Sequence, residues 1–434
     1  MTATRLLKGA TLVLLVVAWL TAAVLLWRAR VPGTLGHPRL APAAYFPRSE
    51  LTRAARYSSG ARLLYLLGVA AELVVLLLLS ARRRRLARAF ALGEIGSGVL
   101  LGVAASLLVA LTTLPAGVAG LWWDRRYGLS KESYPSLLLG QAGGLLSQIV
   151  TVTIVLVIVM LLARRFPRGW WALVAPLLVL VGAVFVLVGA LLAPLGSEPV
   201  RSRPVAAALR RLERREGVAG IRVRVDKVSA QTREVNGETT GLGPTTVVIL
   251  SDTLFRSGLS DRAIEFVSAH ELGHAARRHV WKGLAWALLF TLPLTYLLAR
   301  VTRRFGGLQR AEVVPLALLG SFLLSLLALP LQNAVSRHYE SEADWMALQA
   351  TRDPAAGREA FRSFTRIDLT EPEPPLWSYL ALDDHPTVMQ RLAMTRAWEA
   401  RNAPRAAPSR AGSGSPRATT TSTRSPPSHP RARA

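Results

Sequence analysis

The chain has 434 residues, of which 51% are hydrophobic, 18% are charged and none is cysteine. The charged fraction is below the roughly 25% typical of soluble globular proteins, and the absence of cysteine excludes disulfides, thiolate metal ligands, iron–sulfur clusters and a catalytic thiol. The formal net charge of +26 is carried almost entirely by arginine. Many of these arginines flank apolar stretches, as membrane anchors do, and no zinc-finger spacing or aromatic-interleaved basic motif accompanies them, so we expect no nucleic-acid partner.

Seven charge-poor stretches approach or exceed the roughly 20 apolar residues that a membrane-spanning helix requires. Basic residues precede the first, as in a signal peptide, but no small-residue cleavage site ends it, so we expect a retained helix. Buried helices of a large soluble protein are the alternative, which the length and purity of the stretches disfavour. We predict a mainly α-helical polytopic membrane protein, embedded in a lipid bilayer, whose transmembrane helices lie within 9–27, 63–81, 95–123, 133–163, 169–197, 283–299 and 313–336.

Three polar side chains interrupt these stretches. Glu72 lies near the middle of the second, where an ionisable residue is expected to face the bundle interior or a wet cavity. A protonated packing role is an equally weighted alternative. Gln141 and Gln148 are seven residues apart and therefore share a helix face, so they line the same interior or join helices.

The order of apolar and polar segments predicts the domain organisation. Residues 1–197 are expected to form a five-helix membrane region, and residues 283–336 a transmembrane hairpin. Because a hairpin returns the chain to the same side of the membrane, the polar segments 198–282 and 337–401 are expected to form one soluble domain. Residues 402–434 contain no acidic residue and are rich in Pro, Ser, Thr and Arg, so we predict a disordered basic tail.

The sequence His270-Glu271-Leu-Gly-His274 carries the zincin metal-binding pattern. Residues four apart on a helix share a face, so both imidazoles can bind one ion, and Glu271 can act as general base. Ser260 and Asp261 supply a helix N-cap and a first-turn acid ahead of the motif. A chance match is improbable because the chain has only seven histidines. His279 is not at ligand spacing from His274 and is expected to be a surface or membrane-interface residue.

Zinc requires a third protein ligand and an open coordination position. Glu340 and Asp344 lie four residues apart on the predicted continuation of the last apolar helix. One carboxylate can bind zinc and the other can accept the second ring N–H of a ligand histidine. Without the zincin motif, a solvated helix face would be the favoured interpretation of this pair.

Two weaker elements accompany the motif. His385, followed by proline, could donate a hydrogen bond to the oxyanion of a tetrahedral intermediate, although a His-Pro pair is more often a turn. Residues 236–244 are turn-rich and residues 245–250 are β-branched, which predicts a strand. Such a strand can bind substrate as a sheet edge or belong to a structural hairpin.

Taken in order, five apolar helices, the strand, His-Glu-x-x-His, a two-helix hairpin, Ser-Arg-x-x-Glu-x-x-Ala-Asp and His-Pro-x4-Arg391 resemble the integral-membrane CAAX prenyl protease type I family. The likeness covers about residues 9 to 400 and includes the segments 123–130 and 240–254. It implies a chamber enclosed by seven helices and a zincin-like domain with a small sheet. It also implies one Zn²⁺ per chain.

The resemblance also implies residue roles. His270, His274 and Glu340 would bind zinc, with Glu271 as the base and Asp344 supporting a ligand. His385 would stabilise the transition state, Arg391 would support it electrostatically, and the substrate strand would begin at Asn236 and Gly237. Gly237 departs from the alanine usual in the family.

We therefore predict a zinc endopeptidase that hydrolyses membrane-associated or lipidated peptides and proteins. The composition indicates a bacterial plasma-membrane protein, for which the family name does not establish a prenylated substrate, and the resemblance places the catalytic side in the cytoplasm. A membrane quality-control protease is the main alternative. A protease-like signalling sensor and an inactive scaffold are further ones, and the oligomeric state is not fixed by the sequence.

Overall fold

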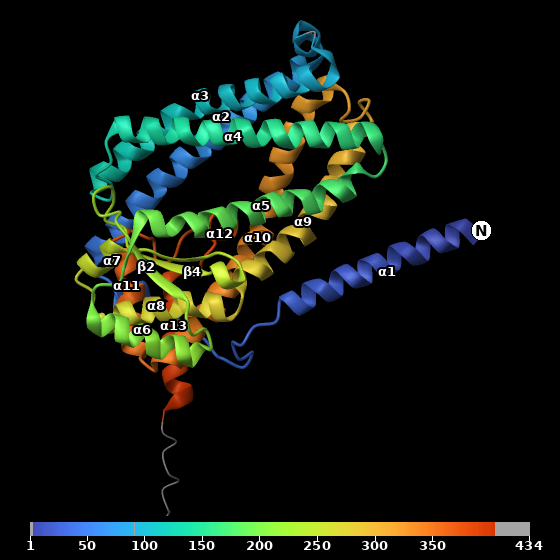
Figure 1. Cartoon of the computed structure of the whole chain (residues 1–434). Coiled ribbons are helices and arrows are strands. Elements are labelled where there is room, and N and C mark those ends of the chain that lie inside the picture. The colour runs from blue at the N-terminus through green and yellow to red at the C-terminus, as the bar shows by residue number, and fades with distance from the viewer. Residues whose placement is uncertain (1–2, 91, 404–434) are drawn as a thin grey trace, which may run out of the picture.

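Long helices dominate the chain. The computed structural model describes residues 3–90 and 92–403, so residues 404–434 of the predicted tail lie outside the described residues. The long helices are α1 (Ala3–Leu26), α2 (Arg48–Phe90), α3 (Gly93–Tyr127), α4 (Tyr134–Arg165), α5 (Trp170–Gly196), α9 (His279–Arg303) and α10 (Val314–Thr351). Helices α2, α3 and α4 lie side by side, while α10 runs from the far end of this bundle into the polar domain (Figure 1).

The apolar surfaces of these helices require a lipid environment. Among the described residues, six helices (α2 to α5, α9 and the helix containing α10) are long and apolar enough to cross a membrane. In the most apolar 18-residue segment of each helix, only 11–33% is buried inside the protein, so most apolar side chains point outward. The predicted mainly α-helical membrane fold with a small sheet is therefore confirmed.

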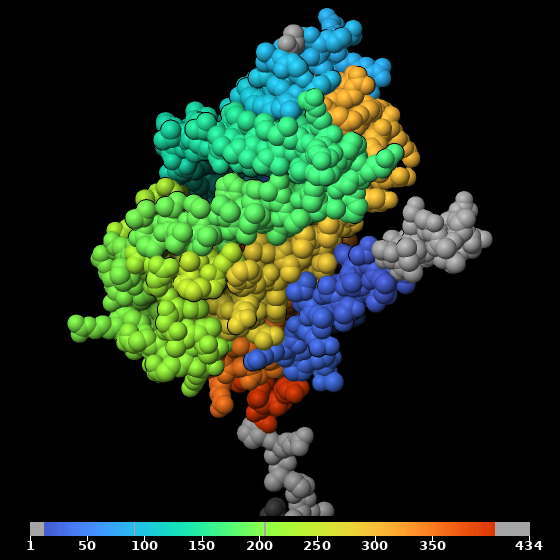
Figure 2. Space-filling model, turned by 45° about the vertical axis from the view of Figure 1, so that its right-hand side comes forward, coloured from blue at the N-terminus to red at the C-terminus, as the bar shows by residue number. Residues whose placement is uncertain are grey.

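The count of spanning helices differs from the prediction by one. Helix α1 has the predicted position, but its apolar part with described side chains, Val13–Leu26, is shorter than a full span. This part packs against the side of α9 and α10, where Trp19, Ala22 and Leu26 contact a cluster around Trp286 and Tyr339. The space-filling view shows α1 in this position, outside the main bundle (Figure 2).

A small mixed sheet lies between the membrane bundle and the zincin-motif helix (Figure 1). Its strands are β1 (Ser197–Pro199), β2 (Arg222–Asp226), β3 (Gly237–Thr240) and β4 (Val247–Ser251), in the order β1-β2-β4-β3. Strands β2 and β4 are parallel, and the other two pairings are antiparallel. The predicted strand 245–250 is thus β4, shifted because Gly243–Thr245 forms a 3-10 turn. The turn-rich segment before it contributes β3, an edge strand of the sheet.

The two polar segments share one hydrophobic core. The remaining helices are α6 (Arg203–Glu216), α7 (Asp252–Arg256), α8 (Asp261–Ala276), α11 (Pro354–Arg366), α12 (Leu376–Ala381) and α13 (Val388–Asn402). Phe266 of α8 packs edge-to-face on Phe361 of α11, and Leu272, Leu348 and Leu392 are fully buried beside them. This core fixes α8 against α10, the two helices that carry the predicted metal ligands.

Candidate metal centre

Helix α8 carries the zincin motif on a buried face. It begins where the Ser260 hydroxyl accepts a hydrogen bond from the Ala263 N–H at 3.2 Å, the N-cap that the sequence predicts. His270 and His274 are one helical turn apart, and their Nε2 atoms lie 3.1 Å from each other. The two imidazoles therefore converge on one point.

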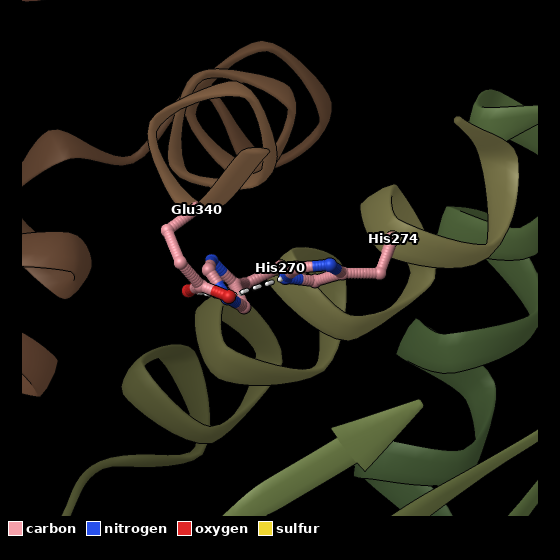
Figure 3. A group of neighbouring side chains, drawn as sticks. All are labelled: His270, His274 and Glu340. Carbon is pink, nitrogen blue, oxygen red and sulfur yellow. Dashed lines mark hydrogen bonds and ion pairs between the residues drawn. The ribbon is translucent and has the colours of Figure 1, made fainter. Parts of the chain in front are cut away.

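Glu340 reaches the same point from α10. Its Oε2 lies 3.2 Å from Nε2 of His270, and its Oε1 lies 3.3 Å from Nε2 of His274. Figure 3 shows the three side chains directed at one another from two helices. Ligand atoms about 3.3 Å apart are what a tetrahedral ion with bonds of about 2.0–2.1 Å requires. The two imidazoles and one carboxylate therefore fit a single metal ion.

The charges around this point favour a cation. Burial would lower the pKa of His270, but the carboxylates of Asp344 and Glu340 outweigh it and raise the pKa to about 9. Burial lowers the pKa of His274 to about 4, so this ring is neutral with a lone pair for a metal. A carboxylate-rich, buried pocket with a neutral imidazole is a suitable environment for a divalent ion.

Asp344 connects the first ligand histidine to α13. Its Oδ1 lies 2.9 Å from Nδ1 of His270, which leaves Nε2 of that ring facing the ligand cluster. Arg391 donates to both carboxylate oxygens, at 2.8 and 2.6 Å, and its guanidinium stacks over the Phe361 ring. Arg391 thus contacts the ligand set only through Asp344.

Glu271 lies beside the ligand cluster and against β3. The Thr239 hydroxyl is 3.0 Å from its Oε2. Burial raises the pKa of Glu271, which brings a carboxylate closer to the range that a general base requires. A Cβ atom at Gly237 would lie 3.0 Å from Cγ and Oε1 of Glu271, so the glycine leaves room for this side chain.

His385 approaches the cluster from the loop before α13. Its Nε2 is 3.1 Å from Glu340 Oε2, and its Nδ1 is 2.7 Å from Asp384 Oδ1. Burial would lower the pKa of His385, but these two carboxylates raise it to about 10. The ring therefore carries a proton, and about half of its side chain is exposed.

A cavity of about 510 Å³ opens onto these residues. Asn236, Gly237, His270, Glu271, His385 and Arg391 all line it. The predicted substrate strand therefore borders the same cavity as the motif. Glu72 and Gln141 lie elsewhere, on a cavity of about 740 Å³ inside the helix bundle. Tyr57 and Ala61 line both cavities.

The expectation for His279 was wrong. This residue is buried, its Nδ1 lies 3.0 Å from Nδ1 of His274, and its Nε2 lies 3.1 Å from Glu342 Oε2. The α8 helix ends at Ala276, and Arg278 adopts a left-handed conformation with φ of 54°, which turns His279 back toward His274. Helical spacing could not reveal this contact, because the helix does not continue through it.

Thr239, Asp384 and Glu342 were also missed. Asp384 is adjacent to His385 in the sequence, so its contact with that histidine could have been predicted. Thr239 depends on the pairing of β3 with β4, which the sequence did not resolve.

Comparison with known proteins agrees with this geometry. Residues 203–399 match Peptidase family M48. The chain is 26% identical over 385 residues to an uncharacterized metalloprotease, YhfN, of Bacillus subtilis (strain 168), covering 83% of this chain and 89% of that protein. The crystal structure of S. mikatae Ste24p superposes with a TM-score of 0.69 at 17% identity, covering 88% of this chain and 96% of that one.

These likenesses establish the class of the protein. The chain carries a Peptidase family M48 domain, and its overall fold is that of Ste24p. The predicted resemblance to the type I CAAX prenyl protease family is confirmed in the fold, and the predicted enzyme class, a metalloendopeptidase, is confirmed. The protein is a membrane metalloprotease.

Proposed function

We propose that this membrane metalloprotease is a zinc-dependent endopeptidase that cuts membrane-associated or lipid-modified peptides. The convergence of His270, His274 and Glu340 within 4.8 Å, beside a cavity that His270 and Glu271 line, is the observation that carries the proposal. We assign one Zn²⁺ per chain to these three side chains. A zinc ion supplies Lewis-acid chemistry and, when bound, lowers the pKa of a coordinated water to about 7.

The remaining chemistry belongs to side chains of this chain. Glu271 takes a proton from the attacking water on a carboxylate oxygen and delivers it to the leaving amine. His385, protonated at Nε2, donates to the oxygen that gains negative charge as the peptide carbonyl becomes tetrahedral. Asp344 keeps the proton of His270 on Nδ1, and Arg391 holds the Asp344 carboxylate in place.

We propose that the substrate main chain pairs with the free edge of β3. This strand is an edge of the sheet, and Asn236 and Gly237 at its start line the catalytic cavity. Main-chain pairing at an edge binds a peptide independently of most of its side chains. The intramembrane cavity, which shares Tyr57 and Ala61 with the catalytic one, is suited to an apolar attachment on the substrate.

The proposal extends to domain organisation and location. We assign 198–282 and 337–401 to one catalytic domain around the 283–336 hairpin, in keeping with their shared core. The bacterial relative supports a bacterial plasma membrane, and the resemblance supports a cytoplasmic catalytic side.

The test uses detergent-purified protein and a fluorogenic peptide library whose members occur with and without a lipid on one residue. We expect the wild type to cut the lipidated members with higher kcat/KM, and Glu271→Gln to cut neither. Equal cutting of both sets would contradict the lipid preference and favour a quality-control endopeptidase. Cutting that persists in Glu271→Gln would overturn the mechanism.

A further inference from the structure

His279 and Glu342 form a buried pair behind the ligand His274. Glu342 is 0% exposed and His279 is 6% exposed, so both side chains are almost entirely shielded from solvent. Nε2 of His279 lies 3.1 Å from Glu342 Oε2, while Nδ1 of His279 lies 3.0 Å from Nδ1 of His274. The three side chains therefore form a continuous line of hydrogen bonds that ends at a predicted ligand.

The hydrogen positions along this line follow from the geometry. His274 directs Nε2 at His270 and Glu340, so a metal there requires the lone pair on Nε2 and the hydrogen on Nδ1. Nδ1–H of His274 then donates to Nδ1 of His279. The remaining hydrogen of His279 lies on Nε2 and is donated to the Glu342 carboxylate. Each contact has one donor and one acceptor under this assignment.

The His279 ring is held in position from its other face. It stacks on Tyr339 with ring centroids 4.6 Å apart and planes at 19°. The Tyr339 hydroxyl donates to the Leu26 carbonyl at 2.7 Å and accepts from Trp286 Nε1 at 2.8 Å. The ring can therefore present Nδ1 to His274 without rotating.

Glu342 is anchored independently of His279. Arg277 donates to Oε1 at 2.6 Å, the backbone N–H of Arg30 donates to the same oxygen at 3.0 Å, and Lys282 lies 3.4 Å from Oε2. These groups come from the ends of α8 and α9 and from the segment after α1. They neutralise the buried carboxylate and fix its direction, so that it acts as a rigid acceptor.

We propose that His279 and Glu342 are positioning residues for His274, the counterpart of Asp344 for His270. The inference rests on the proposed metal function. Each proposed ligand histidine then has its own carboxylate. Asp344 contacts His270 directly, whereas Glu342 reaches His274 through the imidazole of His279. Removal of a partner that orients a ligand histidine typically lowers metal affinity by about 10- to 100-fold.

The experiment measures zinc affinity of the full-length protein in detergent by competition with a chromophoric chelator. His279→Leu removes the acceptor, whereas His279→Asn places an amide oxygen near the position of Nδ1. We expect His279→Leu and Glu342→Gln to bind zinc about 10- to 100-fold more weakly, and His279→Asn to recover most of the affinity. His37→Leu is the matched control, because it makes the same change at an exposed histidine outside this line of hydrogen bonds.

A second readout separates positioning from stability. The melting temperature of the metal-free protein is expected to be the same for His279→Leu and His279→Asn, while the visible spectrum of the Co²⁺-loaded protein changes only for His279→Leu. Wild-type zinc affinity in His279→Leu, or an equal loss in His279→Leu and His279→Asn, would overturn the inference. If the wild type itself binds no metal, the proposed function fails instead.

Discussion

Asp344 accepts a hydrogen bond from Nδ1 of His270 at 2.9 Å, although the two residues are 74 positions apart. Helix α8 supplies the imidazole and α10 supplies the carboxylate. The membrane hairpin between them therefore has to fold before the ligand set is complete. The same α10 helix carries Glu340 one turn earlier, so one helix supplies both a proposed ligand and the carboxylate that contacts a second proposed ligand.

Asp344→Asn is expected to weaken both metal binding and the fold. The amide cannot balance the charge of the buried Arg391 guanidinium, and breaking a buried ion pair costs about 3–5 kcal/mol. Zinc affinity should fall about 10- to 100-fold because a neutral amide oxygen is a weaker acceptor for the His270 N–H than the carboxylate. Chelator competition and thermal unfolding measure the two effects, and unchanged values for both would contradict the role of Asp344.

Gly237→Ala is expected to lower kcat by crowding Glu271. The added Cβ would lie 3.0 Å from Cγ and Oε1 of Glu271, so the carboxylate has to shift by a few tenths of an ångström. Misplacement of a catalytic group by about 1 Å can cost about 10²-fold, so we expect a smaller loss here. Gly196→Ala is the control, because a Cβ there meets open space. Equal kcat in both variants would show that Glu271 is not constrained at this contact.

His385→Ala is expected to lower kcat by about 10²- to 10³-fold, with little change in KM or zinc content. The protonated ring lies 3.1 Å from Glu340 and can donate to a developing oxyanion. His37→Ala serves as the control, because His37 does not line the catalytic cavity. Loss of zinc from His385→Ala would instead make His385 part of the metal site.

The sequence predicts two kinds of feature well: side chains that are close in the sequence and share a helix face, and long apolar segments. His270 and His274 share a helix face by spacing alone, and the apolar stretches locate the membrane helices. Spacing placed Glu340 and Asp344 on one helix face, but only the resemblance assigned the predicted ligand role to Glu340. In the structure, Glu340 faces Nε2 of His270, Asp344 faces Nδ1 of the same ring, and Glu342 faces the basic end of α8.

The contacts that the sequence could not give depend on chain reversals. His279 reaches His274 because Arg278 ends the helix in a left-handed conformation. Glycine usually occupies this conformation, and without one the sequence gives no sign of the break. Thr239 reaches Glu271 because β3 pairs with β4 at one particular register. Both contacts depend on how the chain reverses direction, which the periodicity of helices and strands does not predict.

Asp368→Asn is expected to stabilise the protein at alkaline pH. Burial raises the pKa of Asp368 to about 8, the Val235 N–H opposes this shift and Glu234 adds to it. Because the folded pKa exceeds the ordinary value of 3.8, the contribution of this acid to stability is present below about pH 4 and is lost as the pH rises through about 8. Asparagine cannot ionise and still accepts from Val235.

Thermal unfolding at pH 4 and pH 8 measures this effect. We expect Asp368→Asn to have a higher melting temperature than the wild type at pH 8, with the advantage absent at pH 4. Glu373→Gln, which removes an exposed carboxylate, should give the same difference from the wild type at both pH values. An advantage of Asp368→Asn that is equal at pH 4 and pH 8 would contradict the assigned ionisation.

The central claim is that Glu271 performs proton transfer beside a metal held by His270, His274 and Glu340. The most direct measurement is bound zinc per chain together with peptide turnover, for the wild type, Glu271→Gln and His274→Ala. The account predicts about one zinc in the wild type and Glu271→Gln, turnover only in the wild type, and neither zinc nor turnover in His274→Ala. Full turnover in Glu271→Gln, or stoichiometric zinc in His274→Ala, would contradict it.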